Sequence, residues 1–381
     1  MKPPMPSLTP RQLARIAYRR LPALGPITMD ALQRRRHSER REPAHLNVMT
    51  SLGGNDADVL QVMLLSLVQS HPGDQIDFWL FHLSLSQDKL DGLATFCDGL
   101  PNLTLHVITV QERKDFATLS QLGNRPFGAR FLWYIAHEYL PATMQRIVYI
   151  DPLDTLVTGD LLPFATQPLL GHYIAACRES PTTPPILCKP ALRTDGRALP
   201  DAKVLRISKG VFNSGVMVID LACLRRDKIG MDAYLQTGLL AQERGLGFGD
   251  QGLYSLTHGS NYLRAHDRYN YRFHDFPRGF APVVVHFAGR IAKPFHLKLS
   301  GDQEQQILDH LAQTGDRALR LNPHQTIKAG DLPFYRHWWQ ICAQTPVHDR
   351  IAPIAAEYAT HVLAQPRLPL FQPPQPMRSL A

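Results

Sequence analysis

The chain has 381 residues, of which 44% are apolar and 19% charged, the balance of an ordinary globular protein with one large domain or two smaller ones. Its net charge of +8 is uneven, because residues 1–42 carry ten Lys/Arg and three Asp/Glu, and a nearly neutral body argues against nucleic-acid binding. Five scattered cysteines without a CxxC pair argue against a disulfide framework or a zinc site, and no apolar run reaches the ~20 residues of a bilayer span.

The N-terminal leader, residues 1–42, is the basic part of the chain. Residues 12–21 place Leu13, Ile16 and Ala17 near one helical face, followed by five further arginines up to residue 41. A short basic amphipathic helix can lie on an anionic membrane surface. The alternative is a solvated, partly disordered leader. Because no secretory apolar segment is present, we expect a cytoplasmic protein, with peripheral contact to the inner membrane face through the leader.

From residue 45 onward, short apolar strands alternate with helices. This alternation predicts βαβ units and an α/β fold with a mostly parallel, doubly wound sheet. The expected strands are 46–49, 77–83, 103–110 and 147–150, and the expected helices are 59–68, 88–97 and 131–140.

After residue 154 the pattern is less regular. A proline-rich stretch at 179–210 predicts a long loop, and loops of that length are usually functional. Further strands are expected at 215–219 and 283–287, and further helices at 231–243, 303–315, 333–343 and 351–364. We therefore predict four parts: the leader 1–42, a catalytic domain 43–300, a helical extension 301–364, and a proline-rich tail 365–381.

The first candidate site follows the apolar strand at 147–150, which runs directly into Asp151 and then Asp154. Strands of an open α/β sheet deliver ligand-binding groups at their ends. Two neighbouring carboxylates repel each other unless a cation lies between them, and Mg²⁺ or Mn²⁺ prefers oxygen ligands. The alternative is a strand followed by an ordinary Asp-Pro turn.

Three further segments carry polar groups beside glycines. They are an Asn-Ser-Gly turn at Asn213 directly before a strand, Asp250 with Gln251 at a helix start, and a strand that ends at His286 and leads to Lys293. Histidine is a good metal ligand, and lysine matches a phosphate charge. Taken singly, each also has a structural explanation, as a turn cap, a helix cap or a buried core histidine.

Together and in this order, these segments resemble glycosyltransferase family 8, retaining enzymes that include bacterial lipopolysaccharide galactosyl- and glucosyltransferases. The family's motifs are matched by Tyr-Ile-Asp-Pro-Leu-Asp at 149–154, Phe-Asn-Ser-Gly-Val at 212–216, Asp-Gln at 250–251, and the segment from His286 to Phe295. The resemblance covers roughly residues 45–300. It implies a GT-A fold, in which a Rossmann-like sheet flanked by helices binds a nucleotide sugar.

The resemblance also implies roles for individual residues. Asp151, Asp154 and His286 would hold Mn²⁺ or Mg²⁺, with Asp151 also near the ribose of the donor. Lys293 and the Gly289 backbone would bind the diphosphate. The donor sugar would meet Asn213, and its reactive face would meet the two adjacent residues Asp250 and Gln251, between which the sequence does not choose.

This sequence departs from the family pattern in the region of the donor. The acidic motif is Asp-Pro-Leu-Asp instead of Asp-x-Asp, and His286 lies seven residues before Lys293 instead of six. In an extended strand one extra residue reverses the side chain's face, so a bulge at the proline would be needed to bring the carboxylates together. The usual Thr-Asp-x-x-Tyr after the first strand is missing, and Trp133 replaces a usual arginine, with Arg130 one helical turn earlier.

The sequence thus predicts a retaining hexosyltransferase that moves glucose or galactose from a UDP-sugar to a glycan or lipid-linked acceptor. Its expected setting is surface polysaccharide or lipopolysaccharide synthesis. The alternative is a catalytically inactive relative that acts as a binding protein, because the departures gather at the donor site. Metal-dependent nucleotide binding distinguishes the two.

Overall fold

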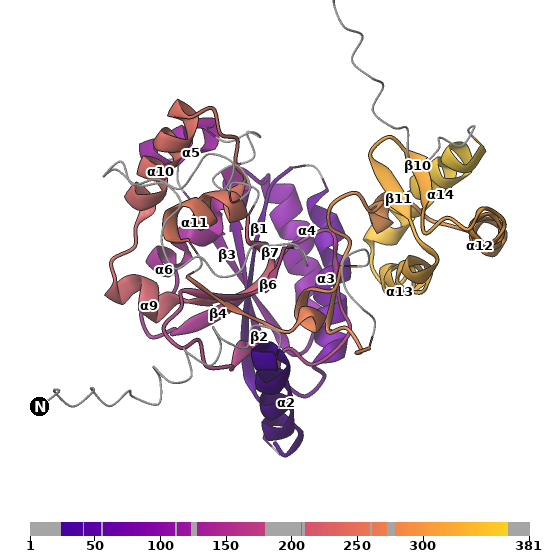
Figure 1. The fold of residues 1–381 in the computed structure, drawn as a ribbon. Helices are drawn as coiled ribbons and strands as arrows, with labels where there is room; N and C mark the ends of the chain where they lie inside the picture. Colours follow the sequence, from indigo (N-terminus) through magenta and orange to yellow (C-terminus); the bar gives the residue numbers. More distant parts are fainter. Residues whose placement is uncertain are drawn as a thin grey trace, which may run out of the picture.

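The protein is described by a computed structural model over residues 24–40, 42–54, 56–110, 113–122, 128–179, 207, 210–259, 261–272 and 279–364. Within these residues, the central sheet has the strand order β3-β2-β1-β4-β7-β6-β8 (Figure 1). All strands run in one direction except β7, which is antiparallel to both neighbours. The strands are β1 His45–Leu52, β2 Gln75–His82, β3 Leu103–Thr109, β4 Arg146–Ile150, β6 Ile174–Arg178, β7 Phe212–Asp220 and β8 Tyr262–Arg264.

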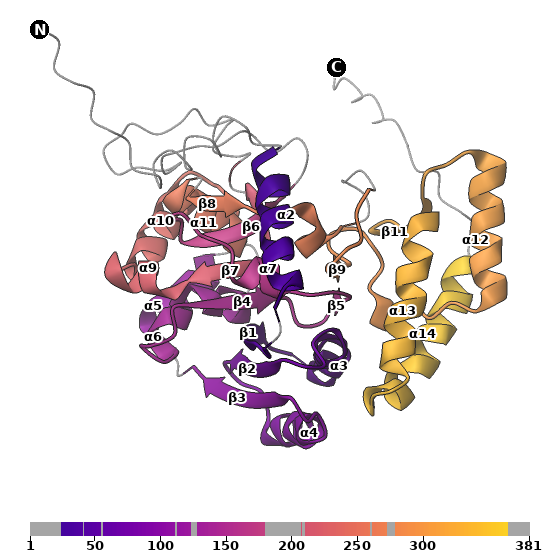
Figure 2. The ribbon, with the colours of Figure 1, turned by 90° about the horizontal axis from the view of Figure 1, so that it is seen from below.

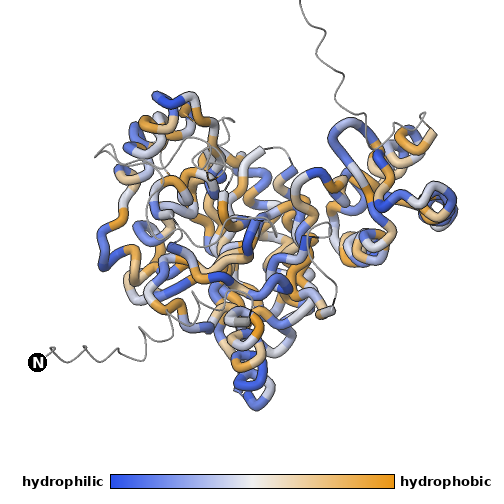
Figure 3. Tube along the Cα trace, viewed as in Figure 1, coloured by the Kyte–Doolittle hydropathy of each residue, from blue (hydrophilic) through white to orange (hydrophobic). Residues whose placement is uncertain are grey.

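Helices cover both faces of this sheet, which confirms the mostly parallel α/β architecture (Figures 1 and 2). The alternating side chains of β1 divide between two apolar clusters, so that Leu46 and Val48 join one and Met49 joins the other. Figure 3 shows the apolar stretches gathered along the central strands. The first cluster is covered by α3 Leu60–Ser70 and α4 Gln87–Asp98, and the second by α5 Lys114–Leu122, η2 Gly128–Ile135, α6 Ala136–Tyr139, α9 Leu221–Arg226, α10 Met231–Glu243 and α11 Asp250–His258.

Two local expectations are wrong. The polar segment at Asn213 is not a turn before a strand: β7 begins at Phe212, and Asn213, Ser214 and Gly215 lie inside it. The region expected as one helix over 131–140 is instead a 3₁₀ helix followed by the short α6. Burial explains the second difference, because Phe131 through Ala136 are all buried and tertiary packing overrides helical propensity there.

A two-stranded antiparallel ribbon lies beside the central sheet, formed by β5 Thr155–Val157 and β9 Val284–His286. The strand expected at 283–287 therefore exists, but it pairs with β5 and not with the central sheet. In this register Thr155 lies opposite His286. The pairing brings the end of β9 next to the segment that follows β4.

The C-terminal part packs against α3, where residues of both join a third apolar cluster (Figures 1 and 2). Helix α12 of this part begins with a capping box between Ser300 and Gln303, and it is followed by Gly315 in a left-handed conformation. The division into domains at residues 42, 300 and 364 stays a prediction. This part contains α12 Gly301–Thr314, β10 Leu319–Asn322, β11 Gln325–Ile327, η5 Ala329–Asp331, α13 Leu332–Cys342 and α14 Val347–Ala364.

The leader contributes helix α2, Leu24–Ser38, which packs against α7, Leu162–Ala165. The amphipathic segment at 12–21, most of the loop at 179–210 and the tail from 365 lie outside the described residues. Among the helices that the structure describes, none is both long and apolar enough to cross a bilayer. Three short 3₁₀ helices connect larger elements: η1 Ala57–Val59, η3 Asp267–Asn270 and η4 Pro294–His296.

Candidate active site

The carboxylates of Asp151 and Asp154 come together in the bend between β4 and β5. The chain leaves the strand after Ile150, and the Thr155 hydroxyl donates to the Asp151 carbonyl at 2.6 Å, closing the bend. The Asp151 amide donates to the Gly215 carbonyl of β7 at 2.8 Å. Because residues 151–154 are bent and not extended, the extra residue of the motif does not send the two carboxylates to opposite faces.

His286 completes this group from the end of β9. Its Nε2 lies 3.5 Å from Asp151 Oδ2 and 3.4 Å from Asp154 Oδ1, and the ring is only 3% exposed. One ligand atom from each of the three residues lies within 4.8 Å of the other two. The structure therefore brings together the three residues predicted as metal ligands.

Lys293 lies beside the same carboxylates. Its ammonium donates to Asp154 Oδ2 and to the Phe287 carbonyl, each at 2.5 Å. The turn between β9 and Lys293 contains Gly289, which is exposed and has φ +73°, a conformation that favours glycine. The longer spacing between His286 and Lys293 thus still leaves the lysine at the acidic pair.

The two carboxylates differ in their electrostatic environment. Burial raises the pKa of Asp151 to about 6, with the Asp154 and Asp250 charges adding to the rise and His286 opposing it. Burial also acts to raise the pKa of Asp154, but Lys293 and His286 outweigh it and hold that pKa well below its usual range. Two carboxylates with opposite shifts indicate a site where negative charge is concentrated and partly compensated.

The residues present fit a divalent cation. They offer two carboxylate oxygens and one imidazole nitrogen, a donor set that suits Mn²⁺ well and Mg²⁺ less well. Ligands at ~2.1 Å from a shared octahedral cation are about 3 Å apart, close to the 3.4 and 3.5 Å found between His286 Nε2 and the carboxylates. A cation here would also relieve the repulsion between Asp151 and Asp154.

Gly215 allows the close approach of β7 to these groups. A Cβ at this position would lie 2.1 Å from His286 Cε1 and 2.8 Å from Asp151 Oδ2. No side chain fits at such distances. The glycine of the Asn-Ser-Gly segment is therefore required by packing against the candidate metal ligands, and not by a turn.

Asn213 belongs to a row of hydrogen bonds that ends at His286. Its Nδ2 donates to Glu179 Oε2 at 3.0 Å, and its Oδ1 accepts from Asn270 Nδ2 at 2.8 Å. Asn270 Oδ1 lies 2.9 Å from His286 Nδ1. Arg272 pairs with Glu179 at 3.2 Å at the far end.

Helix α11 begins at Asp250, as expected, and its first two residues contact different elements, Asp250 contacting η2 and Gln251 contacting β7. Gln251 Oε1 accepts from the Ser214 amide at 3.2 Å. The Asp250 carboxylate accepts from the buried Trp133 indole at 3.2 Å, and the Tyr134 hydroxyl donates to the Asp250 carbonyl. These contacts place Asp250 and Gln251 beside the carboxylate–histidine group.

Comparison with known proteins identifies the family to which this arrangement belongs. The model of glycosyl transferase family 8 matches residues 47–298. The chain belongs to glycosyltransferase family 8. It is therefore a glycosyltransferase, and the region that matches includes each of the residues predicted for the site.

Solved structures of glycosyltransferases share the fold. Galactosyltransferase LgtC in complex with donor and acceptor sugar analogs is 19% identical, with a TM-score of 0.50 over 66% of this chain and 90% of its own. An active-site mutant of LgtC is also 19% identical, with a TM-score of 0.51 over 71% of this chain and 96% of its own. The bifunctional glycosyltransferase WbbM is 14% identical, with a TM-score of 0.51 over 83% of this chain and 52% of its own. No curated protein sequence matches the chain.

The turn after β1 is where this family 8 member departs furthest from the family pattern. Asp56 and Asp58 do not point toward the carboxylate–histidine group; they pair with Arg350 of α14, which lies 3.6 Å from Asp56 and donates to both oxygens of Asp58 at 2.7 and 2.6 Å. At the end of β1 itself, the Ser51 hydroxyl lies 3.1 Å from that of Tyr149, which in turn donates to Asp151 at 3.0 Å.

Arg130 and Trp133 take different positions in η2. Trp133 is buried and holds Asp250, so it does not stand in for the family's arginine. The Arg130 guanidinium lies 3.5 Å from the point where a Cβ on Gly249 would be, at the N-terminus of α11. Arg130, unlike Trp133, therefore brings a guanidinium to the start of α11.

Sequence reasoning missed Glu179, Asn270 and Tyr149 as members of the site. Tyr149 lies in the predicted strand 147–150, directly before Asp151, and Glu179 is the first residue of the loop predicted at 179–210. Asn270 lies in η3 between two tyrosines and belongs to none of the four motifs that resemble the family. Only the fold reveals its contact with His286.

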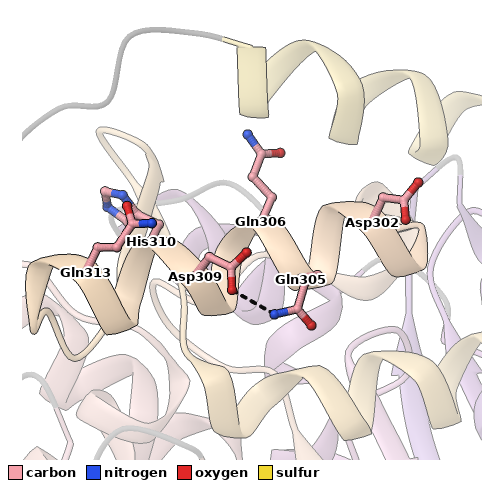
Figure 4. Close-up of a pocket in the computed structure, with 6 residues that line it drawn as sticks. All are labelled: Asp302, Gln305, Gln306, Asp309, His310 and Gln313. Atoms are coloured by element: carbon pink, nitrogen blue, oxygen red, sulfur yellow. Dashed lines mark hydrogen bonds between the residues drawn. The ribbon is translucent and has the colours of Figure 1, made fainter.

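A surface hollow elsewhere carries no comparable chemistry. Figure 4 shows that its lining comes from one face of α12, and most of these side chains are exposed. The one hydrogen bond drawn there joins Gln305 to Asp309 within the helix, at 2.8 Å. The lining residues are Asp302, Gln305, Gln306, Asp309, His310 and Gln313.

Proposed function

We propose that this glycosyltransferase moves a hexose, glucose or galactose, from a UDP-sugar to a glycan acceptor with retention of the anomeric configuration. The observation that carries the proposal is the group of Asp151, Asp154 and His286 with Lys293 at its edge. Together they form a place where a divalent cation and a diphosphate would neutralise one another.

In this proposal the three ligand residues hold Mn²⁺ (or Mg²⁺), which when bound supplies positive charge to the departing UDP. Lys293 exchanges its partner Asp154 for the diphosphate, with the Gly289 amide beside it, and stabilises the charge that develops as the glycosidic bond breaks. Such groups accelerate the reaction because they are already oriented before the charge appears.

Asn213 lines the pocket of the donor sugar, and Asp250 and Gln251 lie at its reactive face. No nucleophile is needed if the acceptor attacks on the same face from which UDP departs, which retains the configuration. Either Asp250, through its negative charge, or Gln251, through its amide, stabilises the positive charge on the anomeric carbon. The electrostatic influence of Asp250 on Asp151 supports their proximity.

The test is calorimetric titration with UDP in the presence and absence of Mn²⁺, using Asp154→Ala and His286→Ala as comparison variants. We expect binding that requires Mn²⁺ and is lost in both variants. A screen of UDP-glucose and UDP-galactose hydrolysis then identifies the sugar. If GDP, TDP or CDP binds and UDP does not, the proposed base is wrong. If no nucleotide binds, the chain is an inactive relative that serves as a binding protein.

We further propose that the acceptor lies at an anionic membrane surface, as in polysaccharide or lipopolysaccharide synthesis. The exposed side of α2 carries Ile27 and Leu32, 53% and 60% exposed, and continues into arginines 34–36. Apolar and basic groups side by side match lipid headgroups and their charge. The protein should sediment together with phosphatidylglycerol vesicles. The double variant Ile27→Ser, Leu32→Ser should bind these vesicles more weakly. Equal binding to neutral vesicles would contradict the proposal.

A further inference from the structure

The row of side chains behind His286 has a fixed direction. From Glu179 it runs through Asn213 and Asn270 to His286, with hydrogen-bond distances of 3.0, 2.8 and 2.9 Å. Its members come from the end of β6, from β7, from η3 and from the end of β9. The two asparagines are 8% and 0% exposed, so water cannot easily replace these bonds.

The orientation of the Asn213 amide follows from two neighbours that allow no choice. The Gly215 backbone N–H, which can only donate, lies 3.1 Å from Asn213 Oδ1. The Glu179 carboxylate, which only accepts when ionised, lies 3.0 Å from Asn213 Nδ2. Exchanging the oxygen and nitrogen of this amide would place donor against donor and acceptor against acceptor.

Asn270 inherits its orientation from Asn213. Because Asn213 presents its oxygen, Asn270 must present its Nδ2, and its Oδ1 then faces His286 Nδ1. An oxygen in that position can only accept a hydrogen bond, so the donor is the imidazole N–H. In a neutral ring this hydrogen bond favours the tautomer with the proton on Nδ1, in which the Nε2 lone pair faces the two carboxylates at 3.4 and 3.5 Å.

We propose that Asn270 is a positioning residue of the metal centre, which keeps the His286 proton on Nδ1 and so leaves Nε2 free to bind the cation. Groups that fix the second nitrogen of a metal-bound histidine commonly change metal affinity 10–100-fold. The inference rests on the proposed metal function, but the tautomer of His286 is a property of the protein without metal and is measured separately.

The first measurement is histidine ¹⁵N NMR of the metal-free protein at pH 8, with His286 assigned by the loss of its signals in His286→Gln. We expect a protonated Nδ1 and an unprotonated Nε2 in the unaltered chain. In Asn270→Leu, which is similar in size but accepts no hydrogen bond, the Nδ1 tautomer should lose its dominance. A wild-type His286 protonated on Nε2 would overturn the proposal.

The second measurement is Mn²⁺ affinity by titration. Asn270→Leu should bind Mn²⁺ about 10–100-fold more weakly. Asn270→Asp restores an acceptor for His286 but cannot donate to Asn213, so it should keep the Nδ1 tautomer and most of the Mn²⁺ affinity. A purely structural role predicts instead that both variants weaken binding alike, and that result would contradict the proposal.

Thr345→Val is the matched control, because Thr345 is 5% exposed and its hydroxyl donates to the Cys342 carbonyl in the C-terminal part. It should lower stability without changing the His286 tautomer or Mn²⁺ binding. If Asn270→Leu changes the tautomer in a protein that binds no Mn²⁺, the positioning role stands and the metal function fails. If Mn²⁺ binds equally well to wild type and Asn270→Leu, the metal function stands and the positioning role fails.

Discussion

The two ends of the proposed donor site are built in different ways. At the end proposed to bind the cation, here called the metal end, Asp151, Asp154 and His286 are each held by partners from other elements, so that β4, β7, β9 and η3 all contribute. At the other end, in the turn after β1, the carboxylates of Asp56 and Asp58 pair with Arg350 of the C-terminal part. One end is organised for a ligand, and the other is organised for packing.

This difference shows which departures from the family pattern the fold absorbs. The extra residue between Asp151 and Asp154 lies in a bend closed by Thr155, and the strand pairing of β5 with β9 still delivers His286 to both carboxylates. The turn after β1 has no such frame. Its acidic residues instead connect the segment after β1 to Arg350 of α14.

The largest expected effect comes from Gly215→Ala at the metal end. The added Cβ would lie 2.1 Å from His286 Cε1, so either the histidine or β7 must move. We expect Mn²⁺ affinity to fall more than about 100-fold, since ligand displacement exceeds the 10–100-fold effect of an altered ligand support. Titration with Mn²⁺ measures it.

Gly92→Ala is the control for that substitution. Gly92 lies inside α4, and a Cβ there would have no atom within 4 Å. Alanine should stabilise this helix by up to about 1 kcal/mol and leave Mn²⁺ binding unchanged. If Gly215→Ala binds Mn²⁺ normally, the metal end is less rigid than the proposed contrast between the two ends of the site requires.

Acid should destabilise the fold through His258, the last residue of α11, the helix that begins at Asp250. Burial among Tyr173, Tyr234 and Tyr254 lowers the pKa of His258 to about 4. Between pH 6.5 and 4 the unfolded chain takes up a proton that the folded chain does not, so stability is lost as the pH falls, by up to about 3 kcal/mol.

His258→Phe keeps an aromatic ring and removes this titration. Urea unfolding at pH 7 and pH 4.5 should therefore show a smaller loss of stability in the variant than in the unaltered chain. An equal loss in both proteins would mean that His258 is solvated in the folded state. The acid sensitivity would then lie elsewhere in the molecule.

A smaller effect is expected from Trp133→Phe, which removes the hydrogen bond to Asp250. The phenyl ring cannot donate to the carboxylate, so we expect about 10-fold slower sugar transfer, the cost of one hydrogen bond to a charged group. Trp338→Phe is the control, because Trp338 is equally buried and, within the described residues, its indole N–H has no partner. A similar loss of activity in both variants would trace the effect to packing.

The sequence predicted the grouping of Asp151, Asp154 and His286 better than the structure around it. The order of apolar strands and helices predicts the sheet, and the motifs at Asp151, Asn213, Asp250 and His286 identify the residues that converge. These signals are local, with each polar group placed at a strand or helix end. The convergence itself depends on the β5–β9 pairing, and strand pairing between segments about 130 residues apart leaves little trace in a single sequence.

Other features were not predictable for a related reason. Asn270 acts through a contact with residues 57 and 16 positions away, and nothing in its neighbours marks it. The role of Asp56 also depends on a distant partner, Arg350. The sequence shows a displaced carboxylate after β1, which suggests a damaged nucleotide pocket. Only the packing of α14 shows that the carboxylate has a different task.

The smallest expected effect tests the other end of the comparison, through Arg350→Met. The Arg350–Asp58 pair is largely exposed, at 45% and 36%, so its loss should cost less than about 1 kcal/mol of stability. Because the turn after β1 serves packing, the affinity for UDP should change by less than about twofold. Arg336→Met, which loses an ion pair to Glu304 within the C-terminal part, is the control. If Arg350→Met lowers the affinity for UDP and Arg336→Met does not, Asp56 and Asp58 belong to the nucleotide pocket, with Arg350 orienting them. Both ends of the site would then be organised for a ligand.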